Sequence, residues 1–431
     1  MTSLPTTSTP ATSLVIGLGR SAVALARFLS GRGDTVIVCD SKPADSLGDH
    51  IQRLPAGVAT LLGGYDRTVL EGVDEVYVSP GVPWDSALLE EARRIGLPVS
   101  SEIDLFFRVC PASIVGITGT NGKTTTTALT GDVLARGPRP VLVGGNIGET
   151  VLDRLEELTP EHWVVLELSS FQLESVARPR VSIGVVLNVT PDHLDRHGSM
   201  DRYVDAKARL VEFMEPADTA VLNGRDPVVR ALADRTHGQV VWFDEHKPIP
   251  PMPVPGRHNI QNALAAAAVG RLAGLDDAMI DAAVADFKGV EHRLELVGEW
   301  EGVRWYNDSK ATNPDAALVA LDAFEEGPVV LIAGGYGSGF ALAEWVAAIR
   351  RRAAAVVLIG ESAGVLEKEL EGHPMVRRAA DMDSAVEIAA SLAVPGAIVL
   401  LSPGYKSFDW YRSYEDRGRR FKQAVESHNR R

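Results

Sequence analysis

The stretch GITGTNGKTTTTAL (residues 116–129) decides the fold, because it nearly matches the phosphate-loop pattern G-x-x-x-x-G-K-[ST]. Counting back from Gly122, Lys123 and Thr124, the first glycine of the pattern falls on Ile117, and a glycine stands at 119 instead. The residues before the loop, SIVGITG, predict a strand, and KTTTTALTGDVLA predicts a helix. This is the setting in which such a loop binds phosphate.

Each residue type in the loop suits a different part of a nucleotide. Gly119 and Gly122 would let several backbone N–H groups face one anion, Lys123 would add a positive charge, and Thr124 would offer a hydroxyl to Mg²⁺. The alternative is an ordinary strand-to-helix turn with a solvated lysine.

Short β-branched runs recur along the chain, each followed by an Ala/Leu-rich segment of helix length. They include SLVIG, TVIVCD, EVYVSPG, SIVGITG, PVLVGGN, WVVLELS, VSIGVVLN, PVVLIAGG, AVVLIG and AIVLLSPG. Near-continuous apolar strands that alternate with helices indicate an α/β protein whose parallel sheets are covered on both faces.

Two breaks in this alternation predict three domains. One lies near IGLPVSSEIDLFFRVCPAS and the other near GVEHRLE. We therefore expect a Rossmann-like N-terminal domain over 1–101, a central P-loop domain over 102–289 and a Rossmann-like C-terminal α/β domain over 290–431.

Composition narrows the possible partners and the compartment. With 43 basic and 57 acidic residues the net charge is -14, which repels nucleic acid and anionic membrane surfaces. The two cysteines, Cys39 and Cys110, are far apart, so a disulfide framework is not expected and the chain is interpreted as cytoplasmic. No apolar run approaches the length of a membrane span.

An earlier glycine loop offers a competing function. VIGLGRSAVALARFL gives Gly17-x-Gly19-x-x-Ala22 between a strand and a helix, and Asp40 ends the next strand. This is the dinucleotide-binding fingerprint, which by itself predicts an NAD-dependent oxidoreductase. Its physical content is narrower, since any nucleoside diphosphate could use the free N–H groups, and a tight turn without a ligand is also possible.

Candidate metal ligands follow two later strands. Glu167 ends WVVLELSS, where a carboxylate faces the ligand crevice of a parallel sheet, although it could instead cap the next helix. NVTPDHLDRHGSMDRYVDAKARL contains His193 and Lys207. Its histidines lack zinc spacing, and a structural polar loop is an equal possibility there.

Taken together, these motifs resemble the Mur ligase family of ATP-dependent amide-forming enzymes of peptidoglycan precursor synthesis. The resemblance covers nearly the whole chain, in the family's order, through GITGTNGKTTTT, GGNIG, ELSSFQLE, LNVTPDHLDRHGS, YVDAKARL, GRHNIQNALAAAA, EHRLE, YNDSKATNPDA and LLSPGYKSFDWYRSYEDRG. ELSSFQLE and NDSKATN are similar to the D-glutamate-adding members.

The resemblance implies ATP, two Mg²⁺ ions and an acyl-phosphate intermediate. By the same resemblance the ATP-binding residues are Gly119, Thr120, Asn121, Gly122, Lys123, Thr124, Thr125, Asn259, Asn262, His292, Arg293, Asp308 and Lys310. The metal ligands would be Thr124, Glu167, His193 and Lys207, the last as a carbamate, and the catalytic residues Lys123, Glu167, His193 and Lys207. For Arg293 and Asp308 a surface ion pair is the alternative.

The resemblance also changes the meaning of the first glycine loop. It implies a site for UDP-N-acetylmuramoyl-L-alanine formed by Arg20, Ser21, Ser41, Lys42, Gly81 and Asn146. NAD then becomes the less favoured cofactor, and a folylpolyglutamate-type ligase is disfavoured because those relatives lack such a domain. We expect small-molecule substrates, no nucleic-acid partner, and a monomer.

The expected site for D-glutamate departs from the family pattern. The residues that correspond to amino-acid contacts are Thr312, Ser338, Lys406, Ser407 and Tyr414. The family's GGxxKxxDF motif is replaced by GGYGSGF, so Ser338 falls near the usual lysine and Lys406 is a cation that could substitute for it. Another Mur-type ligase with a different amino acid therefore stays an alternative.

Overall fold

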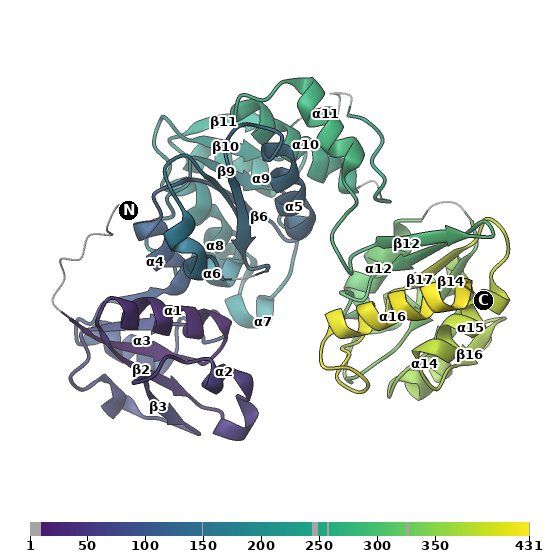
Figure 1. The fold of residues 1–431 in the computed structure, drawn as a ribbon, viewed down its shortest axis with the longest axis horizontal. Helices are drawn as coiled ribbons and strands as arrows, with labels where there is room; N and C mark the ends of the chain where they lie inside the picture. Colours follow the sequence, from purple (N-terminus) through teal and green to yellow (C-terminus); the bar gives the residue numbers. More distant parts are fainter. Residues whose placement is uncertain (1–9, 149, 244–248, 257, 325–326, 431) are drawn as a thin grey trace. The chain divides into compact units, whose positions relative to one another are not determined.

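The computed structural model describes residues 10–148, 150–243, 249–256, 258–324 and 327–430. Its strands form three sheets with helices packed against them, which confirms the predicted α/β class (Figure 1). By internal contacts the chain divides into two compact units, Met1–Pro248 with Gln261–Asp281, and Ile249–Ile260 with Ala282–Arg431. The first unit contains the first two sheets and the second unit contains the third.

The first sheet is parallel, with the strand order β3-β2-β1-β4-β5. Its strands are β1 (Thr12–Ile16), β2 (Thr35–Asp40), β3 (Ala59–Leu62), β4 (Glu75–Val78) and β5 (Val99–Ser101), and its helices are α1 (Arg20–Gly31), α2 (Asp49–Gln52), α3 (Ala87–Arg94) and α4 (Glu102–Val109). Helix α1 buries Leu25 and Leu29 against the sheet. Burying a leucine side chain contributes about 1.5–3 kcal/mol, so this face fixes the helix in place.

The second sheet is also parallel, in the order β11-β10-β9-β6-β8-β7. Its strands are β6 (Ser113–Thr118), β7 (Val141–Gly145), β8 (Trp163–Glu167), β9 (Ile183–Val186), β10 (Thr219–Leu222) and β11 (Gln239–Trp242). The α-helices that follow these strands are α5 (Lys123–Leu134), α6 (Ser170–Glu174), α7 (Leu194–His197), α8 (Met200–Glu212), α9 (Pro227–Ala231), α10 (His258–Leu272) and α11 (Asp277–Asp286).

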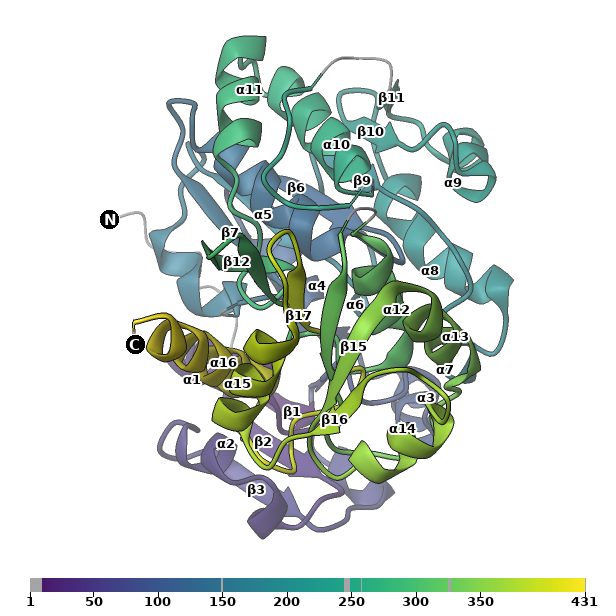
Figure 2. The ribbon, with the colours of Figure 1, turned by 90° about the vertical axis from the view of Figure 1, so that its right-hand side faces the viewer.

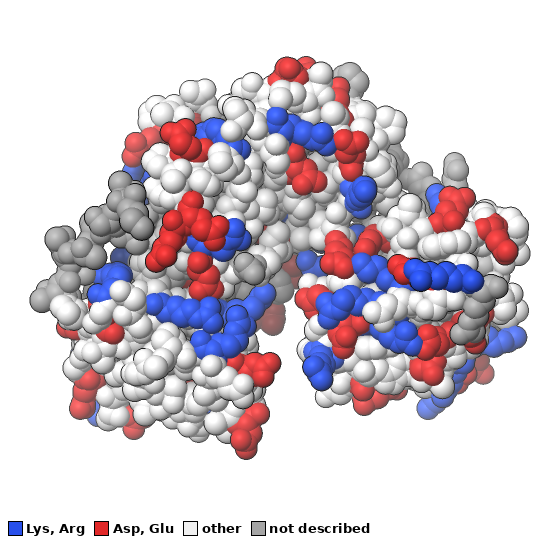
Figure 3. Space-filling view, in the orientation of Figure 1, with Lys and Arg blue, Asp and Glu red and all other residues white. Residues whose placement is uncertain are grey.

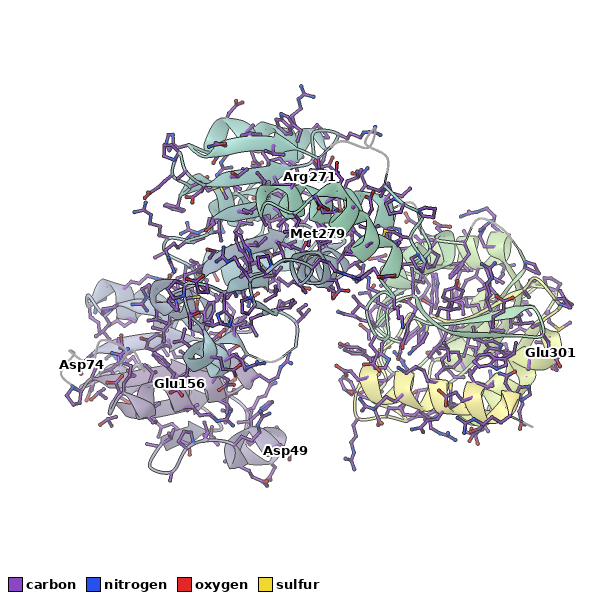
Figure 4. The ribbon with its side chains drawn as sticks, turned by 45° about the horizontal axis from the view of Figure 1, so that its top comes forward. Asp49, Asp74, Glu156, Arg271, Met279 and Glu301 are labelled. Atoms are coloured by element: carbon purple, nitrogen blue, oxygen red, sulfur yellow. The ribbon has the colours of Figure 1, made fainter. Side chains whose placement is uncertain are left out.

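Helices α10 and α11 are joined by a short turn. Arg271 near the end of α10 pairs with Asp277 at the start of α11, with 2.6 Å between Nε and Oδ1. Figure 4 labels Arg271 and Met279 on these two helices. No helix among the described residues has both the length and the apolar character needed to cross a membrane.

The third sheet has the order β12-β13-β17-β14-β15-β16. Its elements are β12 (Glu295–Trp300), β13 (Val303–Asn307), α12 (Pro314–Asp322), β14 (Val329–Ala333), α13 (Ala343–Arg352), β15 (Ala353–Leu358), α14 (Ala363–Glu369), β16 (Val376–Arg378), α15 (Met382–Leu392), β17 (Ile398–Leu401) and α16 (Tyr414–Asn429). Helices α15 and α16 cover one face, and α12, α13 and α14 cover the other (Figure 2).

Strand β12 departs from the all-parallel expectation, because it pairs antiparallel with β13. The two strands are joined by Glu301 and Gly302, whose φ angles are 52° and 74°. Two positive φ angles in a two-residue loop are typical of the hairpin turn that matches strand twist. Figure 4 labels Glu301 at this turn.

Candidate active site

Many of the predicted site residues follow the carboxyl ends of strands within one of the three sheets, whereas Lys207, Asn259, Asn262 and Tyr414 are on helices. In the first sheet they follow β1, β2 and β4, in the second β6, β7, β8 and β9, and in the third β13, β14 and β17. Ligands of open α/β sheets bind at this edge. Within each sheet, the order of strands thus brings residues that are far apart in sequence to the same edge.

The loop after β6 is held in one shape by its glycines and by a neighbouring asparagine. Gly122 has φ 84°, and a Cβ at this position would lie 2.3 Å from Asn262 Oδ1. Asn121 N–H donates to Asn188 Oδ1 at 2.8 Å, and Asn188 Nδ2 donates back to Asn121 O at 3.0 Å. A side chain at 122 would therefore disrupt the loop.

Asn262, on α10, accepts a hydrogen bond from Thr126 Oγ1 at 3.1 Å, which brings it to the start of α5. Asn259 belongs by contacts to the other compact unit. It is buried, and its Nδ2 donates to Pro255 O at 2.6 Å.

Two lysines converge on one carbonyl oxygen of the loop. Lys123 Nζ donates to Gly119 O at 2.9 Å and to Thr120 O at 2.7 Å, and Lys207 Nζ donates to Gly119 O at 2.7 Å. Lys207 is 1% exposed and lies 4.5 Å from the centre of the Tyr203 ring. Burial, followed by the nearby Lys123, lowers the pKa of Lys207 well below its usual value, because both disfavour the charged form.

Glu167 ends β8 with one carboxylate oxygen bonded and the other free. Asn146 Nδ2 donates to Glu167 Oε1 at 2.9 Å, while no described residue makes a hydrogen bond to the buried Glu167 Oε2. Gly145 is required beside it, since a Cβ there would meet Glu167 O at 2.3 Å. A buried carboxylate oxygen without a partner, near a phosphate loop, fits the oxygen ligands that Mg²⁺ prefers. It does not cap a helix, because Ser169 caps α6.

A cavity of about 280 Å³ joins these groups. Its lining residues are Pro80, Gly81, Lys123, Asn146, Ser169, Ser170, Phe171, Asp192, His193, Tyr203 and Lys207. His193 precedes α7 in a left-handed conformation (φ 52°), and its ring lies 5.0 Å from that of Phe171. Residues predicted for the phosphates, the metal and the UDP-linked substrate thus line the same space.

In the first glycine loop, the Asp40 carboxylate accepts hydrogen bonds from two backbone N–H groups. Asp40 Oδ2 accepts from Leu18 N–H at 2.7 Å, and Oδ1 accepts from Lys42 N–H at 2.8 Å. The carboxylate that the NAD hypothesis assigns to a ribose therefore holds two loops together. Arg20 Nη1 reaches Gly148 O at 3.0 Å, and the side chains of Ser41 and Lys42 are exposed, whereas Ser21 is half-buried.

His292, just before β12, and Asp308, just after β13, are both buried at the same edge of the third sheet. Lys310 N–H donates to His292 O, and Asn307 Nδ2 lies 2.9 Å from His292 Nδ1. Asp308 accepts from Ser402 Oγ at 2.8 Å and from Leu294 N–H at 3.2 Å. Burial raises the pKa of Asp308 to about 7, although these hydrogen bonds and Arg293 oppose the shift.

Two of the candidates for amino-acid binding, Ser338 and Lys406, lie at the GGYGSGF loop. The backbone N–H of Tyr336, which stands two residues before Ser338 in that loop, donates to Lys406 O. Lys406 and Ser338 are exposed, Ser407 is buried and Thr312 is half-buried. The ring of Tyr414 lies 6.2 Å from that of His292.

Arg417, on α16, is a buried cation that the sequence analysis missed. It is 1% exposed, and it donates to Ser309 O at 2.8 Å, Tyr405 O at 3.0 Å and Lys406 O at 3.2 Å. Burial lowers its pKa to about 10. The other charged residues of α16 are exposed or half-buried, and Arg420 pairs with Asp383 of α15. Acidic and basic side chains are interspersed on the face drawn in Figure 3.

Tyr203 was also missed. Its hydroxyl lies 3.1 Å from Thr120 Oγ1, and its ring supports Lys207. Nothing in the spacing of YVDAKARL separates a tyrosine that supports a lysine from one that only fills the core. The same holds for Arg417, which stands among other arginines in EDRGRR.

Comparisons with known proteins show which family the chain resembles along its length. The family descriptions "Mur ligase MurD-like, N-terminal domain", "Mur ligase middle domain" and "Mur ligase, glutamate ligase domain" match residues 11–101, 117–250 and 292–404. A UDP-N-acetylmuramoylalanine--D-glutamate ligase of Solibacter usitatus is 44% identical over 435 residues, covering 96% of this chain and 97% of its own. The protein of the same name from Pelotomaculum thermopropionicum is 41% identical over 440 residues, covering 96% of each chain.

A solved structure shares the fold at lower sequence identity. The UDP-N-acetylmuramate-alanine ligase MurC of Thermotoga maritima has a TM-score of 0.60 at 20% identity, covering 97% of this chain and 100% of its own. Three family descriptions and near-full-length relatives above 40% identity lead to one conclusion: the chain belongs to the Mur ligase family.

Proposed function

We propose that this chain is an ATP-dependent ligase that adds D-glutamate to UDP-N-acetylmuramoyl-L-alanine in the cytoplasm, during peptidoglycan precursor synthesis, and that it acts as a monomer. The observation that carries the proposal is that four of the predicted residues line one and the same cavity. They are Lys123, Lys207, Asn146 and His193, and Asn146 donates to the buried Glu167. The names of relatives that match 96% of the chain support the choice of substrates.

The reaction has two steps. The terminal carboxylate oxygen of the UDP-linked substrate attacks the γ-phosphorus of ATP, the bond to the bridging oxygen breaks, and ADP leaves. The amino nitrogen of D-glutamate then attacks the acyl carbon, loses its proton, and phosphate leaves as the C–O bond breaks. The product is an amide.

The loop residues are suited to the first step. Backbone N–H groups of Gly122 and the first turn of α5, with the ammonium of Lys123, would hold the phosphates and offset the charge that develops on them. The N–H groups of Thr120 and Asn121 donate to Asn188 and shape the loop. Thr124, Glu167, His193 and Lys207 as a carbamate would hold two Mg²⁺ ions. When bound, the ions supply charge neutralisation at the phosphates.

A buried lysine amine supports the carbamate. CO₂ reacts with a neutral amine, and the surroundings of Lys207 lower its pKa. The carbamate would replace a cation by oxygen ligands, which suit a hard metal ion.

The remaining contacts follow the positions of the predicted residues. Arg20, Ser21, Ser41, Lys42, Gly81 and Asn146 would bind the UDP-linked substrate. Asn259, Asn262, His292, Arg293, Asp308 and Lys310 would contact the nucleotide. Thr312, Ser338, Lys406, Ser407 and Tyr414 would contact D-glutamate.

Release of phosphate in the presence of ATP, Mg²⁺ and UDP-N-acetylmuramoyl-L-alanine tests the proposal, with one amino acid added at a time. We expect release with D-glutamate only. A preference for another amino acid would overturn the choice of substrate, and release with none would overturn the ligase.

A further inference from the structure

A buried histidine lies directly behind the wall of the 280 Å³ cavity. His197 is 5% exposed, and its Nε2 is 2.9 Å from the Oγ of Ser170, which lines the cavity. His197 also borders a second cavity of about 300 Å³ together with Glu174 and Arg196. Ser170 is thus the contact between this group of residues and the space where the substrates react.

The carboxylate of Glu174, next to the His197 imidazole, favours one direction of the hydrogen bond between His197 and Ser170. Glu174 Oε2 lies 3.6 Å from His197 Nδ1, and Glu174 Oε1 accepts from Arg196 Nη2 at 2.7 Å. A carboxylate beside Nδ1 favours the tautomer with the proton on that nitrogen. In that tautomer Nε2 is an acceptor, so the Ser170 hydroxyl donates a hydrogen bond to His197 and presents only lone pairs to the cavity.

The ring has little freedom to change this arrangement. It stacks on Phe171 at 5.3 Å with an interplanar angle of 20°, and it lies 5.3 Å from the ring of Tyr203. Helix α7, which carries His197, is flanked by left-handed residues, His193 before it and Gly198 after it. The imidazole and the Ser170 hydroxyl are therefore set before any substrate arrives.

The groups that react in the proposed ligation differ in the hydrogen bonds that they can donate. The reacting phosphate and carboxylate oxygens only accept hydrogen bonds. The incoming amino group carries N–H donors and must turn its lone pair towards the acyl carbon. A fixed acceptor on the cavity wall would orient it by binding one of its hydrogens.

We propose that Ser170 is a hydrogen-bond acceptor for the amino group of the incoming amino acid, and that His197 and Glu174 are positioning residues that keep its hydroxyl turned away from the cavity. The inference rests on the proposed ligase function. It assigns Ser170 to the second step and not to the formation of the acyl phosphate.

Three variants separate this role from a structural one. Ser170→Ala removes the acceptor, and His197→Phe keeps a ring but removes the group that orients the hydroxyl. His197→Gln keeps an amide oxygen near the place of Nε2. Ser175→Ala is the matched control, because Ser175 is a buried serine at the other end of α6 that does not line the cavity.

Two measurements are made on each purified full-length variant. One is amide formation with varied D-glutamate. The other is positional exchange of ¹⁸O between the β,γ-bridging and non-bridging oxygens of ATP, with the UDP-linked substrate and no amino acid, which reports acyl-phosphate formation alone.

We expect Ser170→Ala and His197→Phe to raise the KM for D-glutamate or lower kcat by about three- to tenfold, the range of one neutral hydrogen bond. Isotope exchange and the KM values for ATP and the UDP-linked substrate should stay within about twofold, and His197→Gln and Ser175→Ala should resemble the parent. Loss of isotope exchange in Ser170→Ala, a raised KM for the UDP-linked substrate, or parent-like amide formation would each overturn the inference. Failure of the parent itself to form an amide would instead overturn the proposed function.

Discussion

Lys123 and Lys207 donate to the same carbonyl oxygen, that of Gly119, at 2.9 and 2.7 Å. One lysine begins the helix after the phosphate loop, and the other comes from α8 behind it. Two cations this close disfavour each other's charge, and burial adds to this effect at Lys207. Burial and the nearby Lys123 therefore lower the pKa of Lys207 well below its usual value.

Replacing Lys123 by Ala should lower phosphate release by at least about 100-fold, because one preorganised charge on the transferring phosphate is removed. The measurement is steady-state phosphate release. Lys368→Ala, on α14, serves as the control. If Lys123→Ala kept half of the parent rate, the loop would not be the phosphate site.

Lys207 should carry a carbamate. We expect a carbamate signal in the ¹³C spectrum of protein equilibrated with ¹³C-bicarbonate, and no such signal in Lys207→Arg, whose guanidinium does not react with CO₂. The arginine variant should also lose activity. An active Lys207→Arg enzyme without the signal would contradict the role.

Glu102 should make the first unit less stable as the pH rises. It is buried in α4, and burial raises its pKa to about 7 from 4.5. The folded state therefore holds a proton that the unfolded state releases above about pH 4.5. Stability from this group is full below that pH and is lost as the pH rises towards 7.

Glu102→Gln removes this dependence. At pH 8 the variant should be more stable than the parent by about 1–3 kcal/mol, the linkage value for a shift of this size. At pH 4.5 the difference should nearly vanish. The measurement is the thermal unfolding midpoint of the parent and of Glu102→Gln between pH 4.5 and pH 8. A difference between the two midpoints that does not change with pH would refute the prediction.

Arg417 should be needed for the stability of the second unit. Arg417→Met fills the same space but leaves the carbonyl oxygens of Ser309 and Tyr405 without their donor. We expect a loss of about 2–4 kcal/mol in the free energy of unfolding. Arg419→Ala, an exposed change on the same helix, should cost less than about 0.5 kcal/mol. Equal effects of the two changes in urea titrations would contradict this role.

Much of this fold was predictable because buried parallel strands have a plain signature. Runs such as WVVL, which Glu167 follows, and VVLIA are apolar throughout and end at the ligand edge. The strands that the sequence analysis did not identify are mostly at sheet edges, as β3, β5, β11, β12 and β16 are. Edge strands are short and half-exposed, so their composition resembles that of loops.

The residues of the candidate site also divide into those that the sequence could predict and those that it could not. Lys123 and Glu167 were predictable because a loop motif and a strand end define their positions. The roles of Tyr203, His197 and Arg417 depend on packing between distant helices, and their neighbours in sequence contain no sign of it. The three-domain boundaries and the assigned ligand roles stay predictions.

Mass analysis of the nucleotide product tests the central claim most directly. The parent protein, given ATP, Mg²⁺, UDP-N-acetylmuramoyl-L-alanine and D-glutamate, should form a UDP-linked product heavier by one glutamyl residue, with one phosphate released for each product molecule. Unchanged UDP-N-acetylmuramoyl-L-alanine, or a product that contains a different amino acid from an equimolar mixture, would contradict the account.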